Sequence, residues 1–380
     1  MNYLDNDVIL TLLRDLISIP SINPNFDASY NEINLAIYVR DWLQNNQVNA
    51  TIEEVQPGRP NVYAEIGTGD HQVLCLCAHL DTVDVKEMTI DPFDPRVEGN
   101  KVYGRGSCDM KAGLAAVMCA SAAFAKAKIP GKLILALVCD EEFASIGAED
   151  FVKRHKADAC ILTEPSDLKM IICHKGFLWG KVTTSGKAAH GSRWDLGESA
   201  IAKMAKIVCH LEQYDREVLR EQIDDLVGPA SMHVSLINGG SGISTYAAGC
   251  TIHLERRTLP HENIEEVKSG ISTVILGVDS DADIEWTLYR APFNCEPSQK
   301  IVTCVQRSYQ NIMGEPAEIA GWGIWTDAAI FQANGTATVN IGPIGYGLHG
   351  PIEWVDLDSV VKTSHILFDA CVNYFSQGDC

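Results

Sequence analysis

Residues 73–81 read VLCLCAHLD, an apolar run that ends in a histidine and, two positions later, an aspartate. Two further runs, Leu133–Val138 and Ala159–Leu162, are equally short, continuous and apolar. Runs of this kind are typical of strands that are buried on both faces in a sheet covered by helices. We therefore expect the three runs to be strands of one sheet.

Helical segments lie around these runs. Val8–Ile17 and Ile33–Asn45 place apolar residues at intervals of three and four, which is the spacing of surface helices. Ala112–Lys126 is rich in alanine and is followed by Ile129-Pro130-Gly131, a sequence that ends a helix. Because strands and helices alternate, we predict an α/β fold with a mixed, mostly parallel sheet flanked by helices.

From about residue 175 the pattern changes. Three segments alternate between apolar and polar residues, as half-exposed strands do, and two are amphipathic: Trp179–Ser185, Ser231–Ile237 and Thr251–Arg257, with Glu198–Tyr214 and Ile264–Leu276. Their order along the chain predicts a small α+β, ferredoxin-like domain inserted into the first one. We expect a discontinuous domain over residues 1–175 and 293–380 and an inserted domain over residues 176–292.

The chain has 380 residues, with 30 Lys and Arg against 50 Asp and Glu, and its formal net charge is −20. This excess of negative charge argues against nucleic acid and anionic membrane surfaces as partners. The longest apolar stretch, Ala112–Ala125, is shorter than the ~20 residues that a helix needs to span a bilayer.

The N-terminal residues and the cysteines indicate the cellular compartment of the protein. The N-terminal stretch MNYLDNDVILTLLRDL carries acids where a signal peptide has basic residues. The 13 cysteines are odd in number, form no C-x-x-C pair and lie largely in apolar runs, as reduced buried thiols do. We therefore expect a cytoplasmic protein.

Polar side chains follow the apolar runs. His79 and Asp81 follow the first run, Asp140–Glu142 the second and Glu164 the third, whereas Asp109 precedes the Ala-rich helix. The carboxyl ends of parallel strands meet at one edge of a sheet, where ligands bind. Carboxylates gathered there repel one another unless cations offset their charge, and a pair of zinc ions would do so. Taken alone, Asp109 is equally well explained as a helix N-cap. The acidic triplet alone is more often a solvated turn.

At this point the chain resembles a known family: the zinc-dependent hydrolases that include acetylornithine deacetylase, succinyl-diaminopimelate desuccinylase, aminoacylase and carboxypeptidase G. The matching segments are CAHLDTV (77–83), YGRGSCDMKAG (103–113), CDEEFASIGA (139–148), TEPS (163–166), SGKAAHGS (185–192), RRTLP (256–260), WTDA (325–328) and GPIGYGLHG (342–350). They occur in the order of the family over nearly the whole chain. The resemblance implies a zinc exopeptidase-like catalytic domain and an inserted lid that forms the dimer interface.

The resemblance also implies two Zn²⁺ ions per chain, with Co²⁺ as an alternative. The implied metal ligands are His79, Asp109, Glu142, Glu164 and His349, with Asp109 between the two ions. Asp81 would accept the second N–H of His79 and so fix its tautomer. Glu141 would be the general base that takes a proton from the metal-bound water and passes it to the leaving nitrogen.

Two residues of the lid are implied in catalysis and binding. His190 resembles the histidine that reaches the active site of the partner subunit and donates a hydrogen bond to the developing oxyanion; without the resemblance it reads equally well as a surface turn histidine. Arg257 resembles the arginine that pairs with the carboxylate of the substrate, a task that suits its fork of donors. The resemblance therefore predicts a homodimer formed through the lid.

Two places depart from the family. Ile243 and Tyr246 stand where many members have an asparagine and a proline in the lid. Trp322 and Trp325 stand where the desuccinylase has small hydroxyl residues, and bulky apolar rings would oppose a second carboxylate. The predicted substrate is an N-acyl amino acid, and acetylornithine deacetylase, an enzyme of arginine biosynthesis, is the preferred function because the ligand set is complete and Glu164 and Arg257 match the deacylase members.

Three alternatives remain open. Within the family, the chain could be a succinyl-diaminopimelate desuccinylase, or a dipeptidase or carboxypeptidase. The third alternative belongs to another functional class: an inactive binding protein with the same fold. An intact Glu141 beside a complete set of metal ligands argues against that reading.

Overall fold

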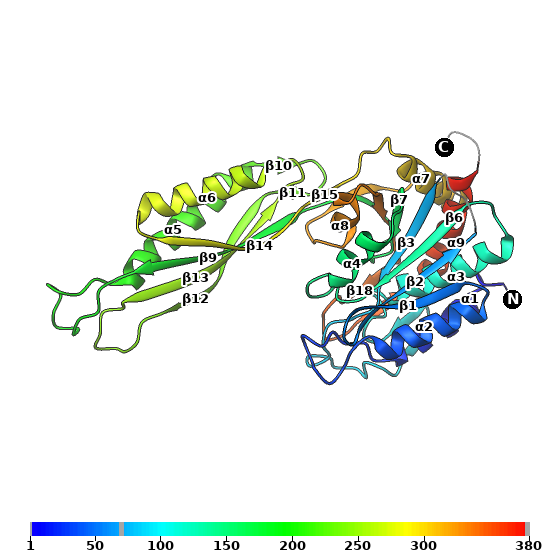
Figure 1. Ribbon diagram of the computed structural model, residues 1–380, viewed down its shortest axis with the longest axis horizontal. Coiled ribbons are helices and arrows are strands. Elements are labelled where there is room, and N and C mark those ends of the chain that lie inside the picture. Colours follow the sequence, from blue (N-terminus) through cyan, green and yellow to red (C-terminus); the bar gives the residue numbers. More distant parts are fainter. Residues whose placement is uncertain (1, 68–71, 377–380) are drawn as a thin grey trace. The chain divides into compact units, whose positions relative to one another are not determined.

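The computed structural model describes residues 2–67 and 72–376. The chain divides into two compact units (Figure 1): the first comprises Met1–Ile172, Cys295–Ala320 and Thr326–Cys380, and the second comprises Cys173–Asn294 and Gly321–Trp325. Among the described residues, no helix combines the length and the apolar character needed to cross a bilayer. The described cysteines form no disulfide, and all of them except Cys209 are buried, as predicted.

A mixed sheet forms the core of the first unit, although β15 and the last residues of β8 and β16 fall within the bounds of the second unit. In the described part of the chain nine strands form it, in the order β1-β2-β6-β3-β7-β17-β8-β15, and β16 pairs with β8. The strands are β1 (Asn49–Gln56), β2 (Arg59–Ile66), β3 (Val73–His79), β6 (Lys132–Val138), β7 (Ala159–Leu162), β8 (Met170–His174), β15 (Phe293–Asn294), β16 (Ile319–Trp322) and β17 (Ala337–Asn340). The neighbours β6, β3, β7 and β17 are parallel, and the outer pairs are antiparallel. The three apolar runs are therefore adjacent central strands, and the predicted α/β class is confirmed.

Helices pack around this sheet. They are α1 (Asn6–Ser18), α2 (Ile33–Asn45), α3 (Lys111–Ala127), α4 (Ile146–Arg154), α7 (Lys300–Met313), α8 (Ala328–Ala333) and α9 (Leu357–Phe375). Helix α3 contacts β3 as well as α1 and α9, and nearly all of its residues are buried. Its alanines suit this place, because small side chains let neighbouring elements approach from several directions. The sequence pattern predicted α1, α2 and α3 but did not resolve α9 as a separate helix.

A small antiparallel sheet joins two distant segments of the first unit. It consists of β4 (Arg96–Glu98), β5 (Lys101–Tyr103), β18 (Gly345–Tyr346) and β19 (Trp354–Asp356), in the order β18-β19-β5-β4. The pairing of β19 with β5 brings the loop that carries His349 beside the turn that precedes Asp109. Two of the predicted metal ligands are thus neighbours although they are far apart in the sequence.

The second unit has its own antiparallel sheet and two long helices (Figure 1). In chain order its main elements are β9 (Gly176–Ser185), α5 (Ala200–Glu217), β12 (Ser231–Gly239), β13 (Gly249–Thr258), α6 (Ile264–Val278) and β14 (Asp283–Arg290). The sheet order is β12-β13-β9-β14, and α5 contacts both the sheet and α6. A turn η1 (Leu219–Glu221) and a hairpin of β10 (Ile223–Asp224) and β11 (Gly228–Pro229) follow α5.

The start of α5 differs from the prediction. The helix was expected from Glu198 but begins at Ala200, because the Ser199 side chain accepts a hydrogen bond from Ala202 N and acts as the N-cap. The strand β14 completes the sheet and was not among the predicted strands. Its side chains are at most half-buried, so its apolar pattern is weak.

Candidate active site

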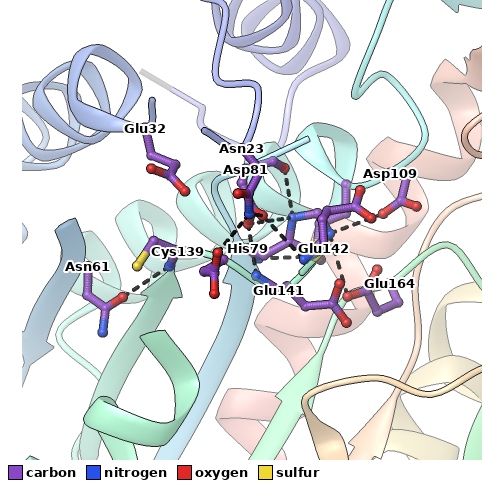
Figure 2. Close-up of polar contacts among 12 residues, drawn as sticks. Asn23, Glu32, Asn61, His79, Asp81, Asp109, Cys139, Glu141, Glu142 and Glu164 are labelled. Atoms are coloured by element: carbon purple, nitrogen blue, oxygen red, sulfur yellow. Dashed lines mark hydrogen bonds and ion pairs between the residues drawn. The ribbon is translucent and has the colours of Figure 1, made fainter. Parts of the chain in front are cut away.

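The predicted metal ligands come from strand ends and loops of the first unit. His79 is the last residue of β3, Glu142 follows β6 and Glu164 follows β7, and these three strands are parallel neighbours. Asp109 precedes α3, and His349 lies between β18 and β19. Figure 2 shows that His79, Asp109, Glu142 and Glu164 converge. The structure therefore brings these side chains together at the carboxyl ends of neighbouring strands.

Asp109 stands between the two imidazoles. Its Oδ1 lies 3.1 Å from His79 Nε2, and its Oδ2 lies 3.3 Å from His349 Nε2. The alternative that Asp109 caps α3 does not hold, because Met110 occupies the N-cap position and no side chain caps the helix there. One oxygen toward each imidazole is the arrangement that a carboxylate shared by two cations requires.

The other carboxylates complete two groups. Glu142 Oε2 lies 2.9 Å from His349 Nε2, and Glu164 Oε1 lies 3.8 Å from His79 Nε2. Among the described residues, two sets have potential ligand atoms within 4.8 Å of one another: His79, Glu141 and Glu164, and His79, Asp109 and Glu142. Glu141, the predicted base, therefore lies in the same space as the ligands.

Burial and mutual repulsion shape the charges of this cluster. Burial, with repulsion from Glu164, raises the pKa of Glu141 well above its ordinary value, and burial with repulsion from Asp109 raises the pKa of Glu142 to about 7. Hydrogen bonds to Asp109 and Glu142 raise the pKa of His349 to about 10. Burial alone would raise the pKa of Asp109, but its hydrogen bonds to the two imidazoles lower it below the ordinary value. So many acids in one buried place require protons or cations to balance them.

The position of Asp81 differs in part from the prediction. The nearest acceptor to His79 Nδ1 is the main-chain oxygen of Asp81 at 2.9 Å, whereas the Asp81 Oδ1 atom is 3.7 Å away. The carboxylate instead accepts hydrogen bonds from the main-chain N–H groups of Glu141 and Glu142, at 3.1 and 3.2 Å. Either acceptor holds the proton on Nδ1 and leaves Nε2 for a ligand. Asp81 therefore fixes the imidazole through its main chain and the two glutamates through its side chain.

Further residues behind Asp81 were not found from the sequence. Asn23 Nδ2 lies 2.8 Å from Asp81 Oδ2 and 2.9 Å from Asp140 Oδ1 (Figure 2 labels Asn23 and Asp81). Arg59 donates to the same Asp140 oxygen at 2.6 Å and to Glu32 Oε1 at 2.7 Å. Asp140 has a left-handed backbone, with φ of 69°, which is costly for a residue with a side chain. Its carboxylate contacts hold the backbone in the conformation from which Glu141 and Glu142 project.

We expect Asn23→Leu to lower the free energy of unfolding by about 2–4 kcal/mol, because two buried carboxylates lose a shared donor. A small displacement of the two glutamates should also lower kcat by about 10–100-fold. Chemical denaturation and steady-state kinetics measure the two effects. Asn373→Leu is the control, since Asn373 Nδ2 likewise donates to two side chains, Asp369 Oδ2 on α9 at 2.9 Å and Ser308 Oγ on α7 at 2.8 Å. Equal kcat in the two variants would contradict a role for Asn23 in placing the glutamates.

His190 and Arg257 belong to the second unit, whereas the carboxylate cluster belongs to the first. His190 is exposed, and its Nδ1 accepts a hydrogen bond from the main-chain N–H of Ser192 at 3.3 Å. Its Nδ1 also lies 2.8 Å from Ser192 Oγ, so both contacts of this ring nitrogen are to Ser192. When Nδ1 accepts from Ser192, the neutral ring carries its proton on Nε2, the atom that the predicted role requires as a donor.

Arg257 is half-exposed on β13. Its Nε donates to Glu255 Oε1 at 2.7 Å, and its guanidinium lies 5.3 Å from the centre of the Phe177 ring. Its neighbour Arg256 is buried on the opposite face of the strand, as the alternation predicted. The arginine that faces outward is thus the one that the resemblance selected.

The residues of the second unit that differ from the family pattern are exposed to different extents. Ile243 is fully exposed, and Tyr246 is half-buried. The Trp325 ring packs at 6.1 Å from both Phe177 and His174, and its Nε1 donates to Ala291 O at 3.0 Å. Trp325 is therefore held within the second unit by packing as well as by a hydrogen bond.

Imidazoles and carboxylates gathered at the carboxyl ends of the parallel strands could hold metal ions, and bound metal ions can activate water for hydrolysis. Residues 75–373 match the model of Peptidase family M20/M25/M40, and the chain belongs to this family. It is a hydrolase that acts on amide bonds, as the motifs predicted.

Several relatives resemble the chain over almost its entire length. Acetylornithine deacetylase of Proteus mirabilis is 28% identical over 381 residues, which cover 96% of each chain. A probable succinyl-diaminopimelate desuccinylase of Staphylococcus aureus is 24% identical and covers 97% of this chain and 98% of its own. The crystal structure of aminopeptidase PepT from Bacillus cereus has a TM-score of 0.82 at 18% identity and covers 98% of this chain and 99% of its own. At these identities the likeness is one of family and fold.

Proposed function

We propose that this enzyme hydrolyses the amide bond of an N-acyl amino acid, in the manner of an acetylornithine deacetylase, with two Zn²⁺ ions in the cluster. The observation that carries the proposal is Asp109, which presents one oxygen to His79 and the other to His349. The likeness to acetylornithine deacetylases over 96% of the chain supports the substrate class. The desuccinylase likeness is weaker in identity, and Trp322 and Trp325 speak against a second substrate carboxylate.

The residues present fit a pair of metal ions. The proposed ligands are His79, Asp109, Glu142, Glu164 and His349. Glu142 Oε1 is buried and has no hydrogen-bond partner among the described residues, which is the expected state of an oxygen reserved for a cation. Imidazole and carboxylate donors suit Zn²⁺, and Co²⁺ accepts the same ligands. When bound, such ions lower the pKa of a coordinated water and polarise a carbonyl oxygen.

Glu141 is the proposed general base. Its main-chain N–H is held by Asp81 Oδ1, so its side chain starts from a fixed point beside the ligands. In this role its carboxylate takes a proton from the attacking water and returns it to the leaving nitrogen. Asp81 keeps the proton of His79 on Nδ1, which leaves Nε2 as the ligand atom.

The second unit is proposed to supply substrate recognition and the dimer. Arg257 would pair with the carboxylate of the amino acid, and His190 would donate its Nε2–H to the developing oxyanion of a site in the partner subunit. The edge of the second sheet supports the homodimer: among the described residues β12 is an edge strand, and its Leu236 and Ile237 are exposed. Exposed apolar side chains on an edge strand favour association with another chain.

Metal content and substrate preference test the proposal together. Protein prepared with zinc should bind two ions per chain, a pair that lies ~3.5–4 Å apart in such sites. It should hydrolyse N-acetyl-ornithine faster than N-succinyl-diaminopimelate or simple dipeptides. A chelator should abolish turnover, and added zinc should restore it. Elemental analysis that finds no metal would refute the site, faster dipeptide cleavage would make the enzyme a peptidase, and metal binding without any turnover would indicate a binding protein.

A further inference from the structure

Glu353 is a fully buried acid four residues after His349, and the sequence pattern gave no reason to single it out. Both of its oxygens accept hydrogen bonds from the turn that precedes α3. The donors to Oε2 are Arg105 Nη1 at 2.7 Å and Gly106 N at 3.0 Å, and the donors to Oε1 are Cys108 N at 2.8 Å and Asp109 N at 3.0 Å. A carboxylate with donors on both oxygens is held in one orientation.

The turn around Glu353 is built to receive an anion. The main-chain N–H groups of Gly106, Cys108 and Asp109 converge on one carboxylate, and buried N–H groups without an acceptor would each cost free energy. Gly106 has a φ of 78°, a left-handed conformation that glycine adopts without strain. Arg105 balances the charge, so that Glu353 adds no net charge beside an acidic cluster.

Glu353 also ties two loops together. Its side chain holds the main chain of Asp109, while its own main-chain oxygen accepts a hydrogen bond from Gly104 N at 3.2 Å. Arg105 strengthens the link, because its Nη2 donates to Gly350 O at 3.3 Å, next to His349. Asp109 and His349, which contact each other through Oδ2 and Nε2, therefore lie on two loops that Glu353 links.

We propose that Glu353 is a positioning residue that sets the place of Asp109 relative to His349 and thereby the affinity of the cluster for metal. Asp109 offers one oxygen to each imidazole, so a shift of its main chain displaces both contacts at once. Residues that orient metal ligands from behind typically change metal affinity by about 10–100-fold when they are replaced. The inference rests on the proposed metal site.

The test is Glu353→Gln, which keeps the shape but replaces one acceptor oxygen by a donor. Its matched control is Asp215→Asn in the second unit, where a buried acid accepts hydrogen bonds from Met232 N at 2.7 Å and from Arg220 Nε at 3.0 Å. Both variants should lose stability to denaturant. Competition with a chromogenic chelator should show that zinc affinity falls about 10–100-fold in Glu353→Gln and stays unchanged in Asp215→Asn.

Wild-type zinc affinity in folded Glu353→Gln, together with the same loss of stability as in the control, would overturn the inference. If Glu353→Gln does not fold, Arg105→Met takes its place, since it removes the side-chain donors to Glu353 and Gly350 and leaves the main-chain contacts of Glu353. Zinc affinity should then fall several-fold, and an unchanged affinity would again overturn the inference. A wild-type chain that binds no zinc would refute the proposed metal site itself, so the two failures are distinguishable.

Discussion

Glu141→Gln is expected to abolish measurable turnover while both metal ions stay bound. Glutamine has the shape of glutamate but cannot accept the proton of the attacking water, and general-base catalysis contributes about 10²–10⁴-fold to rates. The main-chain N–H of residue 141 would still be held by Asp81 Oδ1 at 3.1 Å, so the side chain should stay in place. Steady-state kinetics and elemental analysis of the same preparation measure the two quantities.

Glu142→Gln is the matched control, because it makes the same chemical change at the adjacent residue. Glu142 Oε2 lies 2.9 Å from His349 Nε2, and loss of an anionic ligand should lower metal affinity by at least about 10-fold. Both glutamates belong to groups of side chains that could hold a cation, so their geometry leaves the roles to be separated by experiment. If Glu141→Gln loses metal and Glu142→Gln keeps it, the two assignments are reversed.

His190→Ala should lower kcat by about 10²–10³-fold, the usual effect of removing one donor to a developing oxyanion. Zinc content should not change, because His190 belongs to the second unit and the proposed ligands belong to the first. The exposed side chain contributes little to stability, so the variant should fold normally. An unchanged kcat would show that His190 is a surface turn histidine.

Mixing the inactive variants His190→Ala and Glu141→Gln tests whether a site is shared between subunits. If His190 serves the partner subunit, a mixed dimer has one site with both changes and one site with neither. Random exchange makes half of the dimers mixed, so about a quarter of the wild-type activity should return in a symmetric dimer. If His190 serves its own chain, each site keeps one lesion. No recovery after exchange has been verified by mass spectrometry of tagged chains would refute the shared site.

Much of the fold could be predicted from local pattern. Strand β7 and helix α2 have the predicted bounds, Ala159–Leu162 and Ile33–Asn45. A strand that is buried on both faces has a continuous apolar run, and a helix that is buried on one face has apolar residues at intervals of three and four. The position of the candidate site was predicted from the ends of the same strands. A polar residue at or just after the end of a buried strand lies at the edge of the sheet, so His79 and Glu164 were expected to lie close together.

The second unit shows where local pattern becomes weak. The alternation in β13 separated Arg256 from Arg257, since one face of that strand is buried. In β14 no residue is fully buried, and the strand was not predicted. A half-exposed strand gains little from apolar side chains, so its sequence carries little periodic signal.

The residues that hold the cluster in place were decided only by the tertiary structure. Asn23 and Arg59 lie 117 and 81 residues from Asp140, and Glu353 lies 244 residues from Asp109. Their contacts depend on the order of the strands and the paths of the loops, because a hydrogen bond needs its two atoms within ~3 Å of each other. Such a contact involves one polar residue at a single position and leaves no period in the sequence. The sequence alone therefore predicted which groups could bind metal, and only the fold shows which buried acids and amides contact those groups.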